Sequence, residues 1–334
     1  MKIFVTGATG FIGGRLAQKL AARGDTVVCL ARDPSQVKTN AALPGLQWVR
    51  GDVTEPATFQ AAMRGSDAVF HLAGLYKFGP KYIPQMRAIN VDGARNVLQM
   101  AAELGVPKII HTSTVGVFGN TRGKLVDETY HGNKAEMGSE YERTKYEAHY
   151  DVAVPMQQQG APVIIAQPGG VTGAGDTGPH MGQLDFYLSR MPLGIGAKSG
   201  VTIAHVDDIA EGHIRAAERG KVGEAYILAG PALTWKQMFE ECEKITGIPG
   251  PALWLPGWTV PPMQAFLGAL EGLGINTPFA AESLGSVNDY TYFASAEKAK
   301  RELGWSPRPL QDTLREMLDY EMKKRGLEPA PRAS

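Results

Sequence analysis

The stretch that determines the fold reads Lys2-Ile3-Phe4-Val5-Thr6-Gly7-Ala8-Thr9-Gly10-Phe11-Ile12-Gly13. Its apolar run predicts a buried strand, and the apolar residues that recur from Ile12 predict a helix directly after the glycines. A pyrophosphate binds at such a turn, because glycines let the backbone come close and a helix N-terminus offers free N–H groups. The spacing is G-x-x-G-x-x-G instead of the commoner G-x-G-x-x-G, so a purely structural loop is the alternative. The candidate dinucleotide-binding residues here are Gly7, Thr9, Gly10, Phe11, Ile12 and Gly13.

Outward from this turn, strand and helix patterns alternate. Such alternation predicts an α/β fold, a Rossmann-type doubly wound parallel sheet that binds ligands at the carboxyl ends of its strands. We expect strands at 2–5, 26–31, 46–49, 68–72, 108–112, 163–166 and 225–228, and helices from Phe11 and Pro56 and over 85–104, 137–158 and 206–219.

After Pro168 the pattern becomes irregular and rich in glycine and proline. Short helical segments that begin at Thr234, Val260, Pro278, Ser295 and Pro309 predict a smaller, mostly helical C-terminal substrate lobe. We therefore expect a dinucleotide-binding domain of 1–168 and 201–230, a substrate-binding lobe of 169–200 and 231–327, and a tail of 328–334.

Composition excludes several classes of function. The 334 residues hold 34 Lys plus Arg and 34 Asp plus Glu, so the net charge of zero gives no reason to expect a nucleic-acid partner. The two cysteines, Cys29 and Cys242, predict reduced thiols and no metal site. The amino terminus does not look like a signal peptide, and we expect a cytoplasmic protein.

One long segment, Ile245–Leu270, carries no charged residue. Its length raises the question of a membrane span, but its prolines prevent one continuous apolar helix. We expect an apolar lid over a pocket and no integral membrane segment, with transient contact at a membrane surface as the alternative.

The candidate catalytic residues begin with Tyr141 and Lys145. A Tyr-x-x-x-Lys spacing places both side chains on one helix face, where an ammonium lowers the pKa of a phenol and lets it transfer a proton. The spacing also occurs at Tyr130/Lys134 and Tyr320/Lys324. The first of these precedes the predicted helix and the second lies far along the chain from the phosphate turn, so we favour Tyr141/Lys145.

Further segments match a known pattern in order and spacing together with the glycine-rich turn and the Tyr/Lys pair. The full set is 6–13, 51–53, 71–74, 90–93, 112–119, 141–145, 168–171 and 205–208, with 278–279, 292–295 and 299–305 in the lobe. Together these segments resemble the extended short-chain dehydrogenase/reductase superfamily and its NAD-dependent epimerase/dehydratase family. The resemblance covers nearly the whole chain, and the lobe segments look like the dihydroflavonol 4-reductase-like branch.

The resemblance implies roles for individual residues. Thr114 would bind the reacting oxygen, Tyr141 would be the general acid/base, and Lys145 would tune Tyr141 and hold the nicotinamide ribose. Asn90 would support the active site, with helix capping or packing as the alternative. The resemblance also implies cofactor contacts from Asp52 and Val53 at the adenine, from Leu72, Ala73, Gly74 and Thr112 along the dinucleotide, and from Pro168, Gly169, Gly170 and Val171 at the nicotinamide. The chain departs from the family at Gln167, where many relatives have arginine, and mildly at Gly74.

The expected cofactor is NADP, with NAD possible. An acidic residue that ends the second strand would bind the ribose 2′-OH of NAD, whereas Arg32 follows Ala31 here and suits a 2′-phosphate. The alternative is that Arg32 is exposed to solvent and that Asp33 turns inward instead.

The substrate is expected to be a mostly apolar small molecule. Val115 and Gly116 follow Thr114, which by resemblance disfavours a 4,6-dehydratase, and the lobe has few cations for a sugar nucleotide. Tyr76, Phe78, Trp254 and Trp258 are the candidate substrate residues. We expect Leu255, Met263, Phe266 and Leu267 to form the same apolar wall as the two tryptophans, and Tyr82 to lie beside Tyr76 and Phe78. Ordinary core packing is the alternative role for all of them.

We therefore expect an oxidoreductase that reduces an aldehyde or ketone, or oxidises the alcohol. An epimerase with tightly bound NAD is the second interpretation, and a non-catalytic NADP-sensing regulator is the third. By resemblance we also expect a homodimer through the helices at 85–104 and 137–158.

Overall fold

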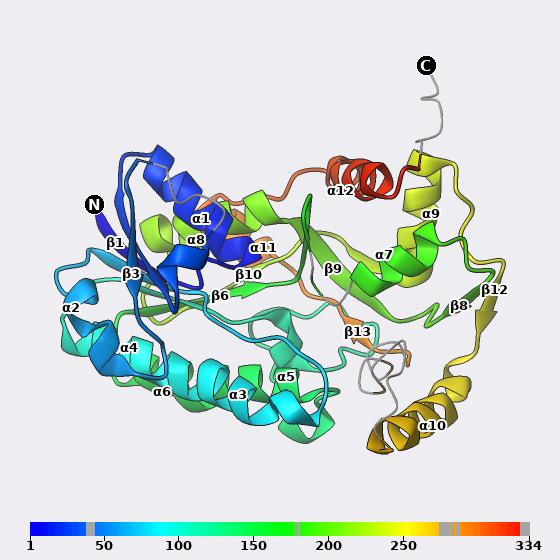
Figure 1. The fold of residues 1–334 in the computed structure, drawn as a ribbon, viewed down its shortest axis with the longest axis horizontal. Coiled ribbons are helices and arrows are strands. Elements are labelled where there is room, and N and C mark those ends of the chain that lie inside the picture. The colour runs from blue at the N-terminus through cyan, green and yellow to red at the C-terminus, as the bar shows by residue number, and fades with distance from the viewer. Residues whose placement is uncertain are drawn as a thin grey trace.

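The structure, a computed structural model, describes residues 1–37, 44–176, 178, 181–273, 281, 284 and 288–327. Its central element is a seven-stranded sheet in the order β10-β6-β5-β4-β1-β2-β3 (Figure 1). Each pair of neighbours in it is parallel. The chain builds outward from β1 in one direction and then continues from β4 in the other, so a crevice forms between these two strands. The strands are β1 (Lys2–Thr6), β2 (Thr26–Ala31), β3 (Leu46–Arg50), β4 (Ala68–His71), β5 (Ile109–Thr112), β6 (Val163–Pro168) and β10 (Ala225–Leu228).

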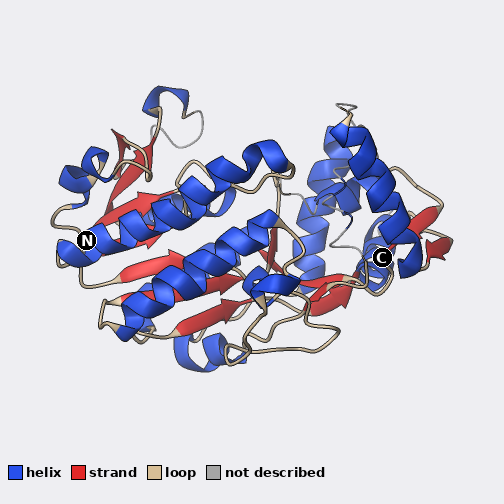
Figure 2. Ribbon diagram, turned by 90° about the horizontal axis from the view of Figure 1, so that it is seen from below, coloured by secondary structure: helices blue, strands red, loops and turns tan. Residues whose placement is uncertain are grey.

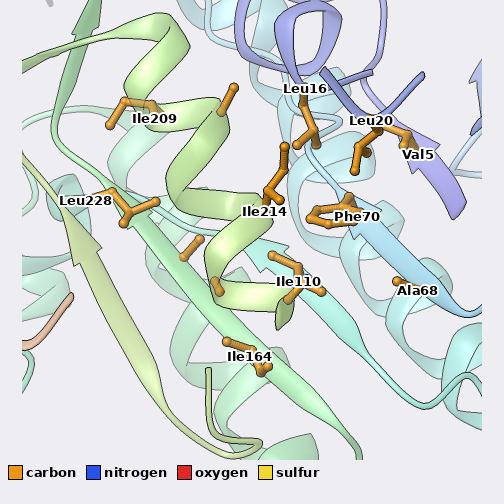
Figure 3. Packing of buried hydrophobic residues seen from close by; sticks show 14 of the residues in the cluster. Val5, Leu16, Leu20, Ala68, Phe70, Ile110, Ile164, Ile209, Ile214 and Leu228 are labelled. Atoms are coloured by element: carbon orange, nitrogen blue, oxygen red, sulfur yellow. The ribbon is translucent and has the colours of Figure 1, made fainter. Parts of the chain in front are cut away.

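Helices cover both faces of this sheet, as the doubly wound prediction requires (Figures 1 and 2). One face carries α1 (Phe11–Ala22), α8 (Val206–Arg219) and α11 (Glu297–Leu303), and the other carries α2 (Gln60–Met63), α3 (Ile83–Arg87), α4 (Gly93–Glu103), α5 (Glu140–Tyr146) and α6 (Val154–Gln158). Each face has its own core. Figure 3 shows the first, in which Leu16 and Leu20 of α1 and Ile214 of α8 pack onto Phe70 and Ile110 of the sheet.

The two long predicted helices exist, but each is interrupted. A π-helical segment, Ala88–Asp92, separates α3 from α4, and a second, Glu147–Ala153, separates α5 from α6. The second helix also begins at Glu140 instead of Met137, because Met137 is extended and the Ser139 side chain accepts a hydrogen bond from the Glu142 N–H as the N-cap.

The lobe contains more strand than its sequence pattern predicted. Its larger sheet has the order β11-β9-β13, and β7 also pairs with β9. All but the first residue of the central strand β9 falls within the range 201–230 expected for the dinucleotide-binding domain. These strands are β7 (Gly170–Thr172), β9 (Gly200–His205), β11 (Ala232–Thr234) and β13 (Thr291–Tyr292), and a separate pair is formed by β8 (Leu193–Ile195) and β12 (Leu253–Leu255).

Within the described residues, the lobe is completed by the α-helices α7 (Met181–Leu188), α9 (Trp235–Thr246), α10 (Val260–Gly272) and α12 (Leu310–Lys324). The uncharged segment is divided between β12, a short turn and α10, and no helix in the described part of the chain is both long and apolar enough to cross a bilayer. The helix expected from Pro278 and the tail expected at 328–334 lie outside the described residues.

Candidate active site

A cavity of about 710 Å³ lies between the carboxyl ends of the central strands and the lobe. On the sheet side its wall consists of strand ends, glycines, hydroxyls and the Tyr/Lys pair. On the lobe side the wall is mostly apolar. The described lining residues from the lobe and its approach include Asp176, Gln183, Phe186, Ile195, Val201, Trp235, Met263, Leu267, Leu284 and Tyr292.

The glycine-rich turn needs its glycines for close backbone packing. Gly7 has φ +75°, and a Cβ there would lie 2.5 Å from the Ala73 nitrogen. A Cβ on Gly13 would lie 2.2 Å from the Gly7 carbonyl oxygen, where no side chain fits. Gly7, Gly10, Phe11, Ile12 and Gly13 line the cavity, whereas Thr9 is exposed and does not.

The start of α1 suits an anionic ligand. Gly10 is the N-cap and no side chain caps the helix, and the first turn of this fully described helix holds no acidic residue. Its free N–H groups and the positive end of its dipole therefore face the cavity without a neutralising partner. The backbone cradle and this helix end fit the pyrophosphate of a dinucleotide.

The loop after β4 is fixed by two polar side chains. Buried Thr6 joins its Oγ1 to His71 Nδ1 at 2.8 Å and accepts from the Ala73 N–H at 3.3 Å. Asn90 binds the Leu75 backbone through both its oxygen and its nitrogen, and also donates to Thr144 Oγ1 at 2.9 Å. Leu72 and Gly74 line the cavity, but Asn90 and Ala73 do not, so Asn90 supports the loop from behind.

Tyr141, Lys145 and Thr114 meet at the cavity, as their expected roles require. Lys145 Nζ donates to the Thr112 carbonyl oxygen at 2.7 Å, and burial lowers the pKa of its ammonium to about 8. Thr114 accepts from the Gly116 N–H at 3.1 Å, which leaves its hydroxyl proton available for a substrate oxygen. The other Tyr/Lys pairs, Tyr130/Lys134 and Tyr320/Lys324, do not line the cavity.

The pKa of Tyr141 is shifted in the direction opposite to that expected from an adjacent ammonium. Burial raises the pKa of this phenol, and the neighbouring Glu142 carboxylate raises it further. The Tyr76 ring stacks on the Tyr141 ring with centroids 3.8 Å apart and an interplanar angle of 10°, which shields the phenol from water. Tyr141 is therefore protonated at neutral pH in the protein alone, as a proton donor must be.

A row of buried histidines lies behind this wall. His149 follows Lys145 by one turn and joins its Nδ1 to the Ser113 hydroxyl at 2.8 Å. Burial, followed by the charge of Lys145, lowers the pKa of His71 and of His149 to about 3, and burial lowers that of His213 to about 4. These imidazoles are neutral at physiological pH.

The expected adenine end lies outside the cavity lining. Arg32 is exposed, and the Asp33 carboxylate accepts from Ser35 and Gln36 within its own turn instead of turning inward. Asp52 accepts from the N–H and the hydroxyl of Thr54, and Val53 is buried in the core. At the opposite end of the expected dinucleotide, Thr112, Pro168, Gly169, Gly170 and Val171 all line the cavity.

Of the candidate substrate residues, Tyr76 and Phe78 line the cavity but Trp254 and Trp258 do not. Trp254 packs against the lobe core, with its ring centroid 5.8 Å from that of Phe239. Trp258 faces solvent, with 75% of its surface exposed. Of the other residues expected at the apolar wall, Met263 and Leu267 line the cavity, and they are four apart on α10 and so share one face. Leu255, Phe266 and Tyr82 are not among the lining residues.

Sequence reasoning missed Glu142, Asp176 and Tyr292. Glu142 follows Tyr141 directly and is buried, and the Tyr292 hydroxyl donates to its Oε1 at 2.6 Å. A glutamate in a helix next to a catalytic tyrosine is ordinarily a solvent-facing residue, and no local pattern indicates that residues 150 positions away cover it.

Comparisons with known proteins agree with this geometry. The model of the NAD dependent epimerase/dehydratase family matches residues 3–229. A protein from Synechocystis sp. whose name assigns it provisionally to dihydroflavonol 4-reductase is 29% identical over 331 residues, which is 95% of this chain and 93% of that protein. Sterol demethylase protein B of Methylococcus capsulatus is 32% identical over 77% of this chain and 78% of its own length.

Solved structures give the same result for the fold. The crystal structure of gox2253 matches with a TM-score of 0.82 and 33% identity, over 98% of this chain and 99% of that one. A structure of MoeE5 in complex with UDP-glucose and NAD matches with a TM-score of 0.74 at 21% identity, over 97% of this chain and all of the other, and shows the shared fold alone. The chain is thus an NAD(P)-dependent oxidoreductase of the extended short-chain dehydrogenase/reductase superfamily, and it belongs to the NAD dependent epimerase/dehydratase family within it.

Proposed function

We propose that this protein is an NADP(H)-dependent reductase of an aldehyde or ketone on a mostly apolar small molecule. The observation that carries the proposal is the pairing of two walls in one cavity: Tyr141, Lys145 and Thr114 on the sheet side, and apolar side chains on the lobe side. A reduced nicotinamide, when bound, supplies the hydride. Thr114 would donate to the carbonyl oxygen, and Tyr141 would give its proton to the alkoxide as it forms.

The charges around the cavity support this class of substrate. Among the described residues, the cations that line the cavity are Lys77 and Lys145, and Lys145 is already bound to the Thr112 carbonyl. A sugar nucleotide carries a pyrophosphate that needs cationic partners at its site. The described acidic residues that line the cavity are Asp176, on the approach to the lobe, and Glu142, in α5, so a neutral substrate is favoured over a sugar nucleotide.

The preference for NADP rests on the end of β2. The Asp33 carboxylate is held by Ser35 and Gln36, and Asp33 is exposed beside an exposed Arg32. The Arg32 guanidinium would bind a ribose 2′-phosphate there. The Asp33 carboxylate does not turn inward to accept a hydrogen bond from a ribose 2′-OH.

The experiment that tests the proposal starts with the cofactor. We would denature the purified protein, identify any dinucleotide that it releases, and then titrate NADPH and NADH. A reductase exchanges its cofactor at every turnover, so an exchangeable site that prefers NADPH, followed by turnover of apolar carbonyl compounds, is the expected result. Stoichiometric retained NAD would instead indicate the epimerase, and tight NADP binding with no turnover over a broad panel would indicate the regulator.

We further propose a cytoplasmic homodimer that pairs through the helical regions 85–104 and 137–158. Sedimentation of the purified protein tests the dimer, and a monomer at micromolar concentration would refute it.

A further inference from the structure

The Glu142 carboxylate is the meeting point of two distant parts of the chain. It lies in α5 directly after Tyr141, is buried, and lines the cavity. Oε2 accepts from the Gly138 N–H at 2.8 Å and from the Tyr290 hydroxyl at 3.1 Å. Oε1 accepts from the Ser139 hydroxyl at 3.3 Å and from the Tyr292 hydroxyl at 2.6 Å.

These four hydrogen bonds use the whole acceptor capacity of the carboxylate. An ionised carboxylate offers about four lone-pair positions to donors, and all of them are taken by protein groups. Glu142 therefore has no remaining position for a substrate hydroxyl or cation, although it lines the cavity. Its contribution must come through the groups that it holds.

Two of the four donors set the start of the catalytic helix. Ser139 is the N-cap of α5, and its side chain accepts from the Glu142 N–H while the Glu142 carboxylate accepts from the Ser139 hydroxyl. Tyr141 is the second residue of this helix, so the cap fixes the path of the backbone that carries it.

The other two donors come from the lobe. Tyr292 ends β13 and lines the cavity, and Tyr290 lies just before that strand. Their rings contact each other with centroids 4.9 Å apart, and β13 runs parallel to β9 in the second sheet. The carboxylate thus joins the lobe sheet to the first turn of the helix that carries the proton donor.

We propose that Glu142 is a positioning residue that, with Tyr290 and Tyr292, latches the substrate lobe to the amino end of the catalytic helix. The inference rests on the proposed function, because it assigns the latch to holding the substrate against Tyr141. Hydrogen bonds to a charged group are stronger than those between neutral groups, and a small displacement of the reacting groups lowers the rate of the chemical step.

The test is a double-mutant cycle on the full-length protein. Glu142→Gln keeps the size of the side chain but removes its charge, and Tyr292→Phe keeps the ring at the cavity but removes the donor. We expect each to lower kcat for carbonyl reduction about 10-fold while the Kd for NADPH stays within about two-fold. The double variant should be no slower than Glu142→Gln, because both changes break the same latch.

The matched control is Glu140→Gln. Glu140 lies in the same helical turn and pairs with Arg143, but it does not line the cavity, so kcat should be unchanged. If Glu142→Gln fails to fold, the same measurements are made on a variant that combines Tyr290→Phe and Tyr292→Phe. This variant leaves α5 unchanged, and we expect the same loss in kcat.

Two results would overturn the latch: single variants within two-fold of the wild-type kcat, or a double variant whose loss is the product of the single losses. If the single variants keep their kcat while Tyr141→Phe is inactive, the latch is refuted but the proposed function is not. An active Tyr141→Phe would refute the proposed function itself.

Discussion

The two walls of the cavity are built in different ways. The sheet wall consists of strand ends and the turns that follow them, and its polar groups are fixed by short hydrogen bonds such as that from Lys145 to the Thr112 carbonyl. The lobe wall consists of apolar side chains from separate helices and strands, such as Phe186, Trp235 and Leu267. Directional bonds define the reacting geometry on the first wall, whereas contact area defines affinity on the second. Proton transfer and substrate choice should therefore respond to different substitutions.

The largest effect is expected at the sheet wall. Tyr141→Phe removes the proton donor but keeps the ring that stacks on Tyr76. We expect kcat/KM for carbonyl reduction to fall by about 10²–10⁴-fold, with little change in the Kd for NADPH. Steady-state kinetics and fluorescence titration of NADPH measure the two quantities.

Tyr146→Phe is the matched control, because Tyr146 lies in the same helix but not at the cavity. Its activity should match that of the wild type. Equal losses in the two variants would mean that the effect comes from the helix and not from the phenol at Tyr141.

The second prediction compares the acid stability of the two regions. His71, His149 and His213 are buried with folded pKa values of about 3, 3 and 4, and the chain has no histidine after His213. Because the unfolded pKa is about 6.5, the unfolded state binds more protons below that pH, and the free energy of unfolding falls as the pH decreases. The loss is on the order of 1–2 kcal/mol for each imidazole at pH 5.

Hydrogen exchange at pH 7 and pH 5, corrected for the intrinsic rates, measures this by region. Peptides from β4 and β5 should lose protection on acidification before peptides from α12. Loss of protection in α12 first would show that acid stability is not set by the buried imidazoles.

The third prediction concerns the edge of the sheet wall. Arg32→Ala should weaken NADPH binding about 10-fold or more, because it removes a charged partner of the 2′-phosphate. NADH lacks that phosphate and provides the internal control, with its Kd expected to stay within about two-fold. Similar losses for both cofactors, measured by calorimetric titration, would contradict the 2′-phosphate role of Arg32.

The smallest effect is expected at the lobe wall. Leu267 lines the cavity, whereas its neighbour Phe266 leaves 63% of its surface exposed. Leu267→Ala should raise KM for an apolar carbonyl compound about 5-fold with kcat nearly unchanged, because about 1 kcal/mol of apolar contact is lost.

Phe266→Ala on the same helix should leave KM unchanged. A larger rise in KM for Phe266→Ala than for Leu267→Ala would show that the substrate meets the other face of α10.

The sequence predicted the sheet wall well and the lobe wall poorly, for a physical reason. Backbone geometry requires glycine at Gly7 and Gly13, so the local pattern is enough to indicate the turn. Tyr141 and Lys145 share their spacing with two other pairs, and their position after a predicted sheet strand distinguished them. Strand β9 lies among glycines and prolines, and its partners β7, β11 and β13 come from distant parts of the chain. The substrate residues show the same contrast: Tyr76 and Phe78 reach the cavity, but hydrophobicity alone did not distinguish Trp254, in the lobe core, from Leu267.

The position of β13 also affects how the protein is made. The central sheet is complete once Leu228 has been synthesised, but Tyr290 and Tyr292 reach Glu142 only about sixty residues later. Contacts this distant in sequence form slowly, and domains fold as the ribosome releases them. During synthesis we therefore expect a stage in which the strands of the central sheet are complete but α11 and most of the lobe wall are still to be made, and the apolar surface that these later segments cover then favours aggregation.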